Sequence, residues 1–159
     1  AKRLEGKALV VWLGGERRPE SDPAGFVALG TVDHASAYLR YADIYLQPSN
    51  HEGLSMSLLE ALSAGLPCVA SSVGGNIETL GLPPGSLRDD GSEESRETGS
   101  GFLVPNDAAA MSAALSRLSG DEGLRRRMGA AARAAWERRY SSAVMAESYL
   151  SLYEELARG

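Results

Sequence analysis

The sequence has little of the chemistry that disulfides or metal clusters need, since Cys68 is its only cysteine. A single thiol excludes an internal disulfide and a zinc site built on several cysteines. Cys68 stands in the apolar run 67–70, which predicts a buried and inert thiol. Long hydrophobic runs are also missing. The longest, Ala8 to Leu13, ends at Gly14-Gly15, far short of the roughly 20 residues of a membrane helix.

Positive charge is not in excess either. The 16 basic and 21 acidic side chains give a net charge of −5, which argues against general nucleic-acid binding. With 159 residues, 43% of them apolar, the composition is typical of one globular domain and excludes a fibrous or disordered chain. The sequence begins with Ala1 and shows no signal peptide, so we expect an N-terminally truncated, cytoplasmic domain.

Short apolar runs alternate with helical patterns, which is typical of an α/β domain with a mostly parallel sheet. The predicted strands are Ala8–Leu13, Phe26–Leu29, Ile44–Gln47, Cys68–Ser71 and Phe102–Val104. The predicted helices are Ala35–Tyr41 capped by Asp33, Ser57–Ala64, Asn76–Leu80, Ala108–Leu118 capped by Asp107, one from Gly120-Asp121 to about Tyr140, and an amphipathic last helix capped by Ser141 or Ser142.

One stretch, residues 81–100, does not fit this alternation. From Gly81 to Gly101 the chain holds five glycines, two prolines, four serines and five acidic residues, with few apolar side chains. A loop of about 20 residues is uncommon inside a compact domain. We therefore expect residues 81–100 to be a mobile loop insertion.

The most informative segment is 42–67, where a buried strand is followed by a polar turn with Glu52 and then by a helix with Glu60. Ligands of open α/β sheets bind at the carboxyl ends of strands. Backbone N–H groups at a helix start, beside the small Gly53, would bind a phosphate. Two carboxylates would repel that phosphate, so we expect them to face paired hydroxyl groups. A diphosphate between two polyols is a nucleotide sugar.

This segment resembles the retaining glycosyltransferases of family 4 (glycosyl transferases group 1), which share two glutamates separated by seven residues. Glu52 and Glu60 have that spacing. The neighbouring strings ADIYLQPS, EALSAGLPCVAS, GGNIE (74–78) and GFLVPND (101–107) match as well. The resemblance spans residues 8–157 without the insertion. It implies a Rossmann-like, doubly wound parallel sheet with C-terminal helices, the donor-binding half of a GT-B fold.

The resemblance also implies what the site residues do in moving a sugar from a nucleotide diphosphate sugar to an acceptor hydroxyl. Glu60 would bind the ribose, and Glu52 would act in catalysis by contacting hydroxyls of the donor sugar. No metal or other cofactor is implied, because an Arg and a Lys neutralise the diphosphate in this family. The residues whose main chain would hold the diphosphate are Gly53, Leu54 and Ser55, and those against the base are Thr31 and Val32.

The sequence departs from the family at its start. The family's Arg and Lys lie on a Gly-Arg…Lys-Gly stretch that is not found here, and Lys2 and Arg3 do not match it. The acceptor domain that precedes it is not found either, and we expect the last helix (141–157) to contact that domain. A first strand would belong between the first and third predicted strands. We therefore expect no regular ladder between residues 9–13 and 44–47.

Other interpretations of the same residues stay open. Ser57 and Glu60 have the spacing of a capping box, which would tie Glu60 to the helix start. Gly74-Gly75 could form a pocket wall or merely let the chain turn into the next helix. The domain could instead belong to a nucleotide-sugar epimerase of this fold, or to a module that binds a nucleotide or a partner chain without catalysis.

The remaining charged and titratable residues are assigned to the surface. We interpret His34 and His51 as loop or first-turn residues rather than catalytic bases. Asp89-Asp90 lacks a D-x-D pattern and a histidine partner, so solvated acids are favoured over a metal site. The arginines of the long helix point in several directions, which favours a solvated surface and at most weak peripheral membrane contact. These are Arg125, Arg126, Arg127, Arg133, Arg138 and Arg139.

Overall fold

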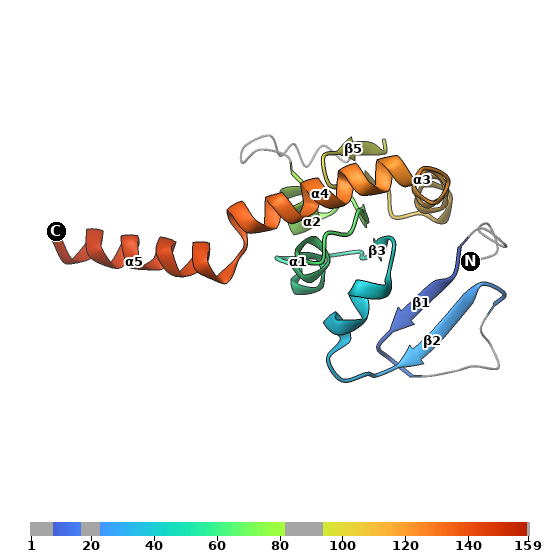
Figure 1. Ribbon diagram of the computed structural model, residues 1–159, viewed down its shortest axis with the longest axis horizontal. Helices are drawn as coiled ribbons and strands as arrows, with labels where there is room; N and C mark the ends of the chain where they lie inside the picture. The colour runs from blue at the N-terminus through green and yellow to red at the C-terminus, as the bar shows by residue number, and fades with distance from the viewer. Residues whose placement is uncertain (1–7, 17–22, 82–93, 159) are drawn as a thin grey trace.

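The computed structural model of the chain describes residues 8–16, 23–81 and 94–158. Helices and strands alternate along most of the chain, and three helices follow one another at its end (Figure 1). The strands are β1 (Val10–Leu13), β2 (Phe26–Gly30), β3 (Tyr45–Gln47), β4 (Cys68–Ser71), β5 (Arg96–Thr98) and β6 (Gly101–Val104). The helices are η3 (Ala35–Tyr41), α1 (Met56–Ser63), α2 (Gly74–Thr79), α3 (Ala108–Gly120), α4 (Glu122–Arg139) and α5 (Ser142–Arg158).

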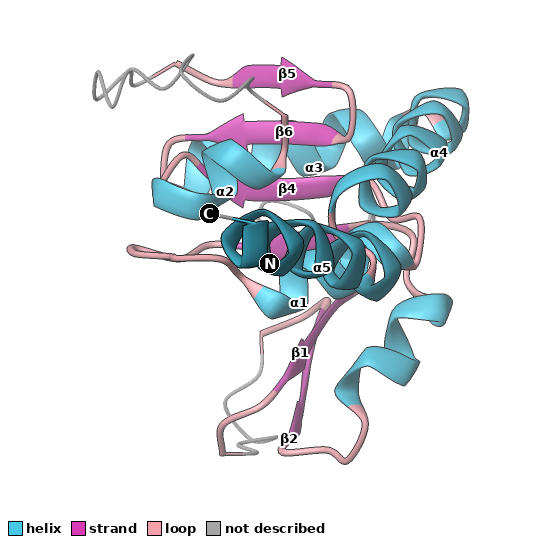
Figure 2. Cartoon of the chain, turned by 90° about the vertical axis from the view of Figure 1, so that its left-hand side faces the viewer, coloured by secondary structure: helices cyan, strands magenta, loops and turns pink. Residues whose placement is uncertain are grey.

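The strands form two separate sheets. β3, β4 and β6 run parallel in that order, and β5 is added antiparallel at the outer edge of β6. β1 and β2 pair parallel in a two-stranded sheet, which lies below the larger one in Figure 2. As predicted, no ladder joins β1 to β3 within the described ranges. The idea that a further strand fits between them stays a prediction.

β4 lies at the centre of the hydrophobic core, because all four of its residues are buried. Successive side chains of a strand point to opposite faces of its sheet. Cys68 and Ala70 pack against α1, α2 and α4, whereas Val69 packs against α3 and the first turns of α4. Helices therefore cover both faces of the sheet (Figure 2), which confirms the predicted doubly wound arrangement. Burial also raises the pKa of the Cys68 thiol, as expected of an inert cysteine.

The expected loop 81–100 contains a strand that the sequence did not reveal. Arg96–Thr98 forms β5, which pairs with β6 through a tight turn at Gly99-Ser100. The Thr98 hydroxyl closes the turn by accepting a hydrogen bond from the Ser100 N–H at 3.3 Å. The strand is polar and only three residues long, so it has no hydrophobic alternation to mark it. Residues 82–93, with Asp89-Asp90, lie outside the described residues.

The segment Ala35–Tyr41 is a 3₁₀ helix rather than the expected α-helix capped by Asp33. Its N-cap is His34, which has a left-handed backbone (φ 54°) and no side-chain capping bond. None of its residues is buried. Packing therefore does little to favour a regular α-helix there, and the tighter form typical of short connections is found.

α5 differs from the other α-helices because no residue of it is buried. It extends away from the rest of the described molecule toward the C-terminus (Figure 1). Its large apolar side chains lie open to solvent, Leu156 being 69% exposed. Nowhere in the described ranges is a helix both long and apolar enough to cross a membrane.

The packing of α4 against the turn after α1 gives a testable prediction. A Cβ on the buried Gly129 would lie 2.3 Å from the main-chain oxygen of Gly65, so Gly129→Ala should lower the free energy of unfolding by about 1–3 kcal/mol. The exposed Gly123 of the same helix is the control, because its Cβ would meet only side-chain ends of Asp121 and Arg127. Gly123→Ala should change stability by no more than about 1 kcal/mol. Urea unfolding followed by circular dichroism measures both variants, and equal losses would contradict this packing.

Candidate functional site

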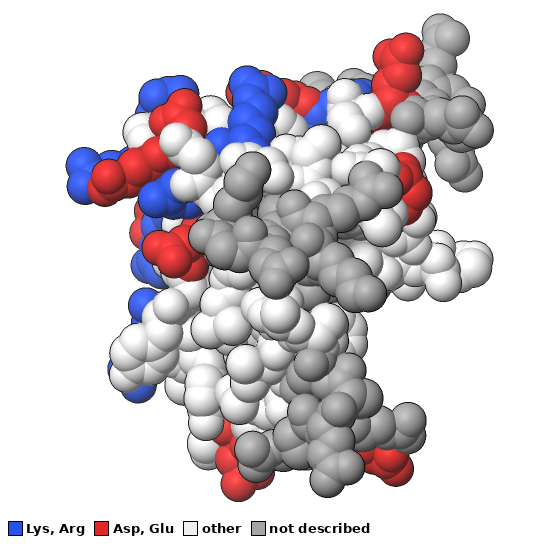
Figure 3. All heavy atoms as spheres, turned by 90° about the vertical axis from the view of Figure 1, so that its right-hand side faces the viewer, with Lys and Arg blue, Asp and Glu red and all other residues white. Residues whose placement is uncertain are grey.

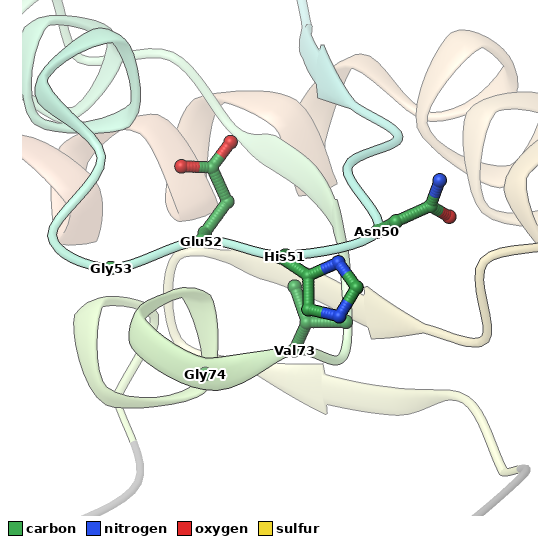
Figure 4. A pocket seen from close by; sticks show the side chains of 6 residues that line it. All are labelled: Asn50, His51, Glu52, Gly53, Val73 and Gly74. Carbon is green, nitrogen blue, oxygen red and sulfur yellow. The ribbon is translucent and has the colours of Figure 1, made fainter.

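The carboxyl ends of β3 and β4 bring two loops together. Gln47, the last residue of β3, pairs with Ala70 of β4, so the chain leaves both strands at the same edge of the sheet. The loop after β3 leads to α1, and the shorter loop after β4 leads to α2. Between them lies an open hollow of about 550 Å³, within the size range of small-molecule sites. Its lining residues, labelled in Figure 4, are Asn50, His51, Glu52, Gly53, Val73 and Gly74.

The two loops touch at the glycine pair that begins α2. The Gly75 N–H donates to the main-chain oxygen of Glu52 at 3.1 Å. A Cβ on Gly74 would lie 2.4 Å from that oxygen, and a Cβ on Gly75 would lie 1.8 Å from the oxygen of Gly53. Any side chain at either position would push the loops apart. The glycine pair is therefore required by close approach, and Gly74 also forms part of the pocket wall.

Glu52 stands at the middle of the loop after β3 and is half-buried. The Ser49 hydroxyl donates to its carboxylate at 2.6 Å, while Gly75 holds its main chain. The carboxylate points to the other side of the loop from the His51 ring (Figure 4). The predicted sugar-binding carboxylate thus has a fixed place beside the hollow.

The start of α1 offers free donors next to Glu52. None of the main-chain N–H groups of Gly53, Leu54 and Ser55 donates a hydrogen bond within the described part of the chain. Ser55 is buried, and its hydroxyl accepts hydrogen bonds from the Leu58 N–H at 3.4 Å and from Gln47 Nε2 at 3.0 Å. Free N–H groups at a helix start favour an anion. The three predicted amides are therefore close together and unused.

The capping-box interpretation of Glu60 is wrong. Ser55 is the N-cap of α1, and the helix begins at Met56 rather than at Ser57 as expected. Ser57 lies inside the first turn and accepts a hydrogen bond from the Tyr45 hydroxyl at 2.8 Å. The sequence favoured Ser57 because Glu60 follows it by three residues, whereas the bond from Gln47 to Ser55 depends on the folded chain.

Glu60 is exposed, and its carboxylate accepts no hydrogen bond from the described residues. The charges of Glu60 and Glu52 both act on the Tyr45 phenol. Burial raises the pKa of the Tyr45 phenol, the hydrogen bond with Ser57 lowers it, and the negative charges of Glu52 and Glu60 raise it further. Both carboxylates therefore lie within electrostatic range of one side chain, and Glu60 remains free to bind a ligand.

Thr31 and Val32 are not brought into this hollow. They follow β2, which belongs to the other sheet, and they are absent from its lining. Thr31 is exposed and Val32 half-buried. Their contact with a nucleotide base stays a prediction.

Three lining residues were not predicted as site residues: Asn50, His51 and Val73. Asn50 accepts a hydrogen bond at 2.6 Å from Asn106 Nδ2, in the loop between β6 and α3. A third loop thus meets the site at the same sheet edge. The sequence offered one signal for these three residues, their position beside predicted ones. Asn50 and His51 precede Glu52, and Val73 precedes Gly74. The structure agrees that His51 is an exposed loop residue, although it lines the hollow.

The arginines of α4 make local contacts rather than one basic patch. Arg126 pairs with Glu122, and Arg133 pairs with Glu137 and donates to the Ser63 oxygen. Figure 3 shows basic and acidic side chains interspersed on one face of the molecule. Within the described ranges, no group of three or more side chains is suited to hold a metal ion. The exposed ion pairs of Arg126 and Arg133 agree with the predicted solvated surface.

The fold is shared with solved structures of longer proteins. Sucrose-phosphate synthase from Thermosynechococcus elongatus superposes with a TM-score of 0.71 at 24% identity, over 93% of this chain and 38% of that chain. Anabaena Alr3699/HepE, solved in complex with UDP, gives a TM-score of 0.71 at 13% identity, over 94% of this chain and 49% of that chain. The architecture is therefore that of the GT-B glycosyltransferases.

The sequence supplies the family. The profile described as Glycosyl transferases group 1 matches residues 2–121. Phosphatidyl-myo-inositol mannosyltransferase from Mycobacterium leprae is 34% identical over an alignment of 157 residues that covers 94% of this chain and 38% of that protein. The chain belongs to the glycosyl transferases group 1 family, as its motifs predicted. It spans well under half of the length of this relative.

The start of α1 can be tested by paired serine variants. Ser55→Ala removes the N-cap and leaves the buried Gln47 amide without its partner, so it should cost about 1–3 kcal/mol of unfolding free energy. Ser57→Ala removes the hydrogen bonds of a solvent-exposed hydroxyl with the hydroxyls of Tyr45, at 2.8 Å, and Ser55, at 3.2 Å, and should cost less, at most about 1 kcal/mol. Chemical denaturation compares the two. A larger loss for Ser57→Ala would restore the capping-box interpretation.

Proposed function

We propose that the chain is the donor-binding domain of a retaining glycosyltransferase that moves a sugar from a nucleotide diphosphate sugar to an acceptor hydroxyl. The observation that carries this proposal is the Glu52 carboxylate, held beside a hollow next to three unused N–H groups at the start of α1. Such N–H groups bind phosphate, and a carboxylate accepts hydrogen bonds from sugar hydroxyls. The UDP in the complex of HepE supports a nucleotide as ligand.

In this proposal each site residue has one task. The N–H groups of Gly53, Leu54 and Ser55 bind the diphosphate, and Glu60 accepts hydrogen bonds from the ribose hydroxyls. Glu52 binds hydroxyls of the donor sugar and stabilises positive charge on that sugar as its bond to phosphate loosens. No metal ion is needed when cationic side chains from elsewhere in the complete protein neutralise the diphosphate.

We also propose that α5 contacts the acceptor domain of the complete protein. Tyr149, Tyr153 and Leu156 are 53%, 61% and 69% exposed on this helix, which buries no residue of its own. An apolar surface of this kind fits a protein partner. The same helix carries Glu147, Glu154 and Glu155, which do not suit an anionic membrane.

The role of Glu60 can be tested by binding. In the complete gene product, Glu60→Ala should weaken UDP or GDP binding roughly 10- to 100-fold, because hydrogen bonds to a charged group contribute about 1.5–3 kcal/mol. Titration calorimetry in EDTA also tests whether a metal is needed. Glu122→Ala, an exposed glutamate in the first turn of α4, is the control and should leave the affinity unchanged. Equal affinity of Glu60→Ala and the unsubstituted protein would contradict the ribose role.

The 159-residue chain alone should transfer no sugar. Transfer needs a positioned acceptor and a neutralised diphosphate, and this chain matches only 38% of the length of the mannosyltransferase. Radiolabelled UDP-glucose and GDP-mannose, offered with the complete protein's acceptor, should give background counts with the chain and turnover with the complete protein. Turnover by the chain itself would mean that it carries its own acceptor site and cation.

A further inference from the structure

A series of hydrogen bonds connects α2 and β4 with the Glu52 carboxylate. On α2, Asn76 Nδ2 donates to the main-chain oxygen of Ser71 at 3.1 Å. The Ser71 hydroxyl, at the end of β4, donates to the main-chain oxygen of Ser49 at 2.5 Å. The Ser49 hydroxyl then donates to Glu52 at 2.6 Å. Each of these hydrogen bonds is short enough that the position of one group constrains the position of the next.

The first two residues of this series, Asn76 and Ser71, are polar side chains buried in the core. Ser71 and Asn76 are both 0% exposed. Buried polar groups cost free energy unless they are hydrogen-bonded, and the Asn76 Oδ1 atom is buried with no partner in the described residues. Apolar side chains of similar size would fill the same space without this cost. Packing alone therefore does not account for the two polar side chains.

Their hydrogen bonds do have a consequence for the loop after β3. The β3–β4 ladder ends at Gln47, which is followed by Pro48. The Ser71 hydroxyl instead fixes the oxygen of Ser49, one residue further on. Together with the bond from the Gly75 N–H to the Glu52 oxygen, this fastens the loop on both sides of the hollow-lining residues Asn50 and His51.

We propose that Ser71 and Asn76 are positioning residues for Glu52. They hold the Ser49 main chain, so that the Ser49 hydroxyl presents the carboxylate at one place before any ligand arrives. Neither residue lines the hollow, so neither needs to touch the donor. The inference rests on the proposed function, in which Glu52 binds the donor sugar. A carboxylate fixed in advance loses less freedom on binding.

The first test needs no ligand. In the complete gene product, Ser71→Ala should speed amide hydrogen exchange at Gly75, whose N–H donates to the Glu52 oxygen, about 3- to 10-fold, because the loop that carries this oxygen is no longer held at Ser49. Peptides from α3 should be unchanged. The control is Ser100→Ala, a buried serine at the other end of β4, where the Cys68 N–H donates to the Ser100 oxygen. No change at Gly75, or equal acceleration throughout the sheet, would overturn the proposal.

The second test separates positioning from structural damage by using the sugar. Ser71→Ala should weaken UDP-glucose or GDP-mannose binding about 3- to 10-fold but bare UDP or GDP less than about twofold. In a Glu52→Ala background, Ser71→Ala should cause no further loss. Loss of equal size in both backgrounds, or equal loss for the bare nucleotide, would mean a general structural role and overturn the proposal.

Ser49→Ala is the second variant, since Ser49 is only half-buried and its loss should not prevent folding. It should reproduce the sugar-specific loss of affinity, and unchanged sugar binding would contradict the last step of the series. If the unsubstituted protein binds neither the nucleotide sugars UDP-glucose and GDP-mannose nor the nucleotides UDP and GDP, the proposed function is wrong. The exchange experiment still decides then whether Ser71 holds the loop.

Discussion

The site depends on one constraint: at the carboxyl edge of β3 and β4, two loops approach so closely that no Cβ fits between them. Gly74 and Gly75 meet this constraint, and the N–H of Gly75 uses the contact to hold the oxygen of Glu52. The main chain of the second loop thus becomes one wall of the hollow. A larger residue at either position would separate Glu52 from its support, and the start of α1 follows Glu52 directly.

Such an approach needs a rigid base, which the core provides. β4 is buried on both faces, so its end cannot shift without disturbing the side chains of α1, α2 and α3. Ser71 is the last residue of this strand and continues the rigid region into the loop by its hydroxyl. The polar contacts around Glu52 therefore begin where the apolar packing ends. Catalytic groups placed at strand ends gain precision from that arrangement.

Features with a local signal in the sequence could be predicted, whereas features that depend on contacts between elements could not. Strands with regular apolar patterns, such as Cys68–Ser71, were predicted correctly, because their signal is local in the chain. The spacing of Glu52 and Glu60 is a local signal too, and their roles stay predictions. β5, whose residues Arg96–Thr98 are polar, exists through pairing with β6 and so has no local signal. The same holds for the capping role of Ser55, which Gln47 stabilises from another element. Contacts between separate elements decided each of these differences.

The position of the single cysteine has a practical consequence. The Cys68 thiol is fully buried in the central strand, and burial raises its pKa, so the reactive thiolate is scarce in the native state. A thiol reagent can reach it only when β4 separates from α1 and from its neighbouring strands. The rate of chemical labelling therefore reports how often the centre of the domain opens. The protein thus carries its own kinetic probe of core opening, with no added label and no competing thiol.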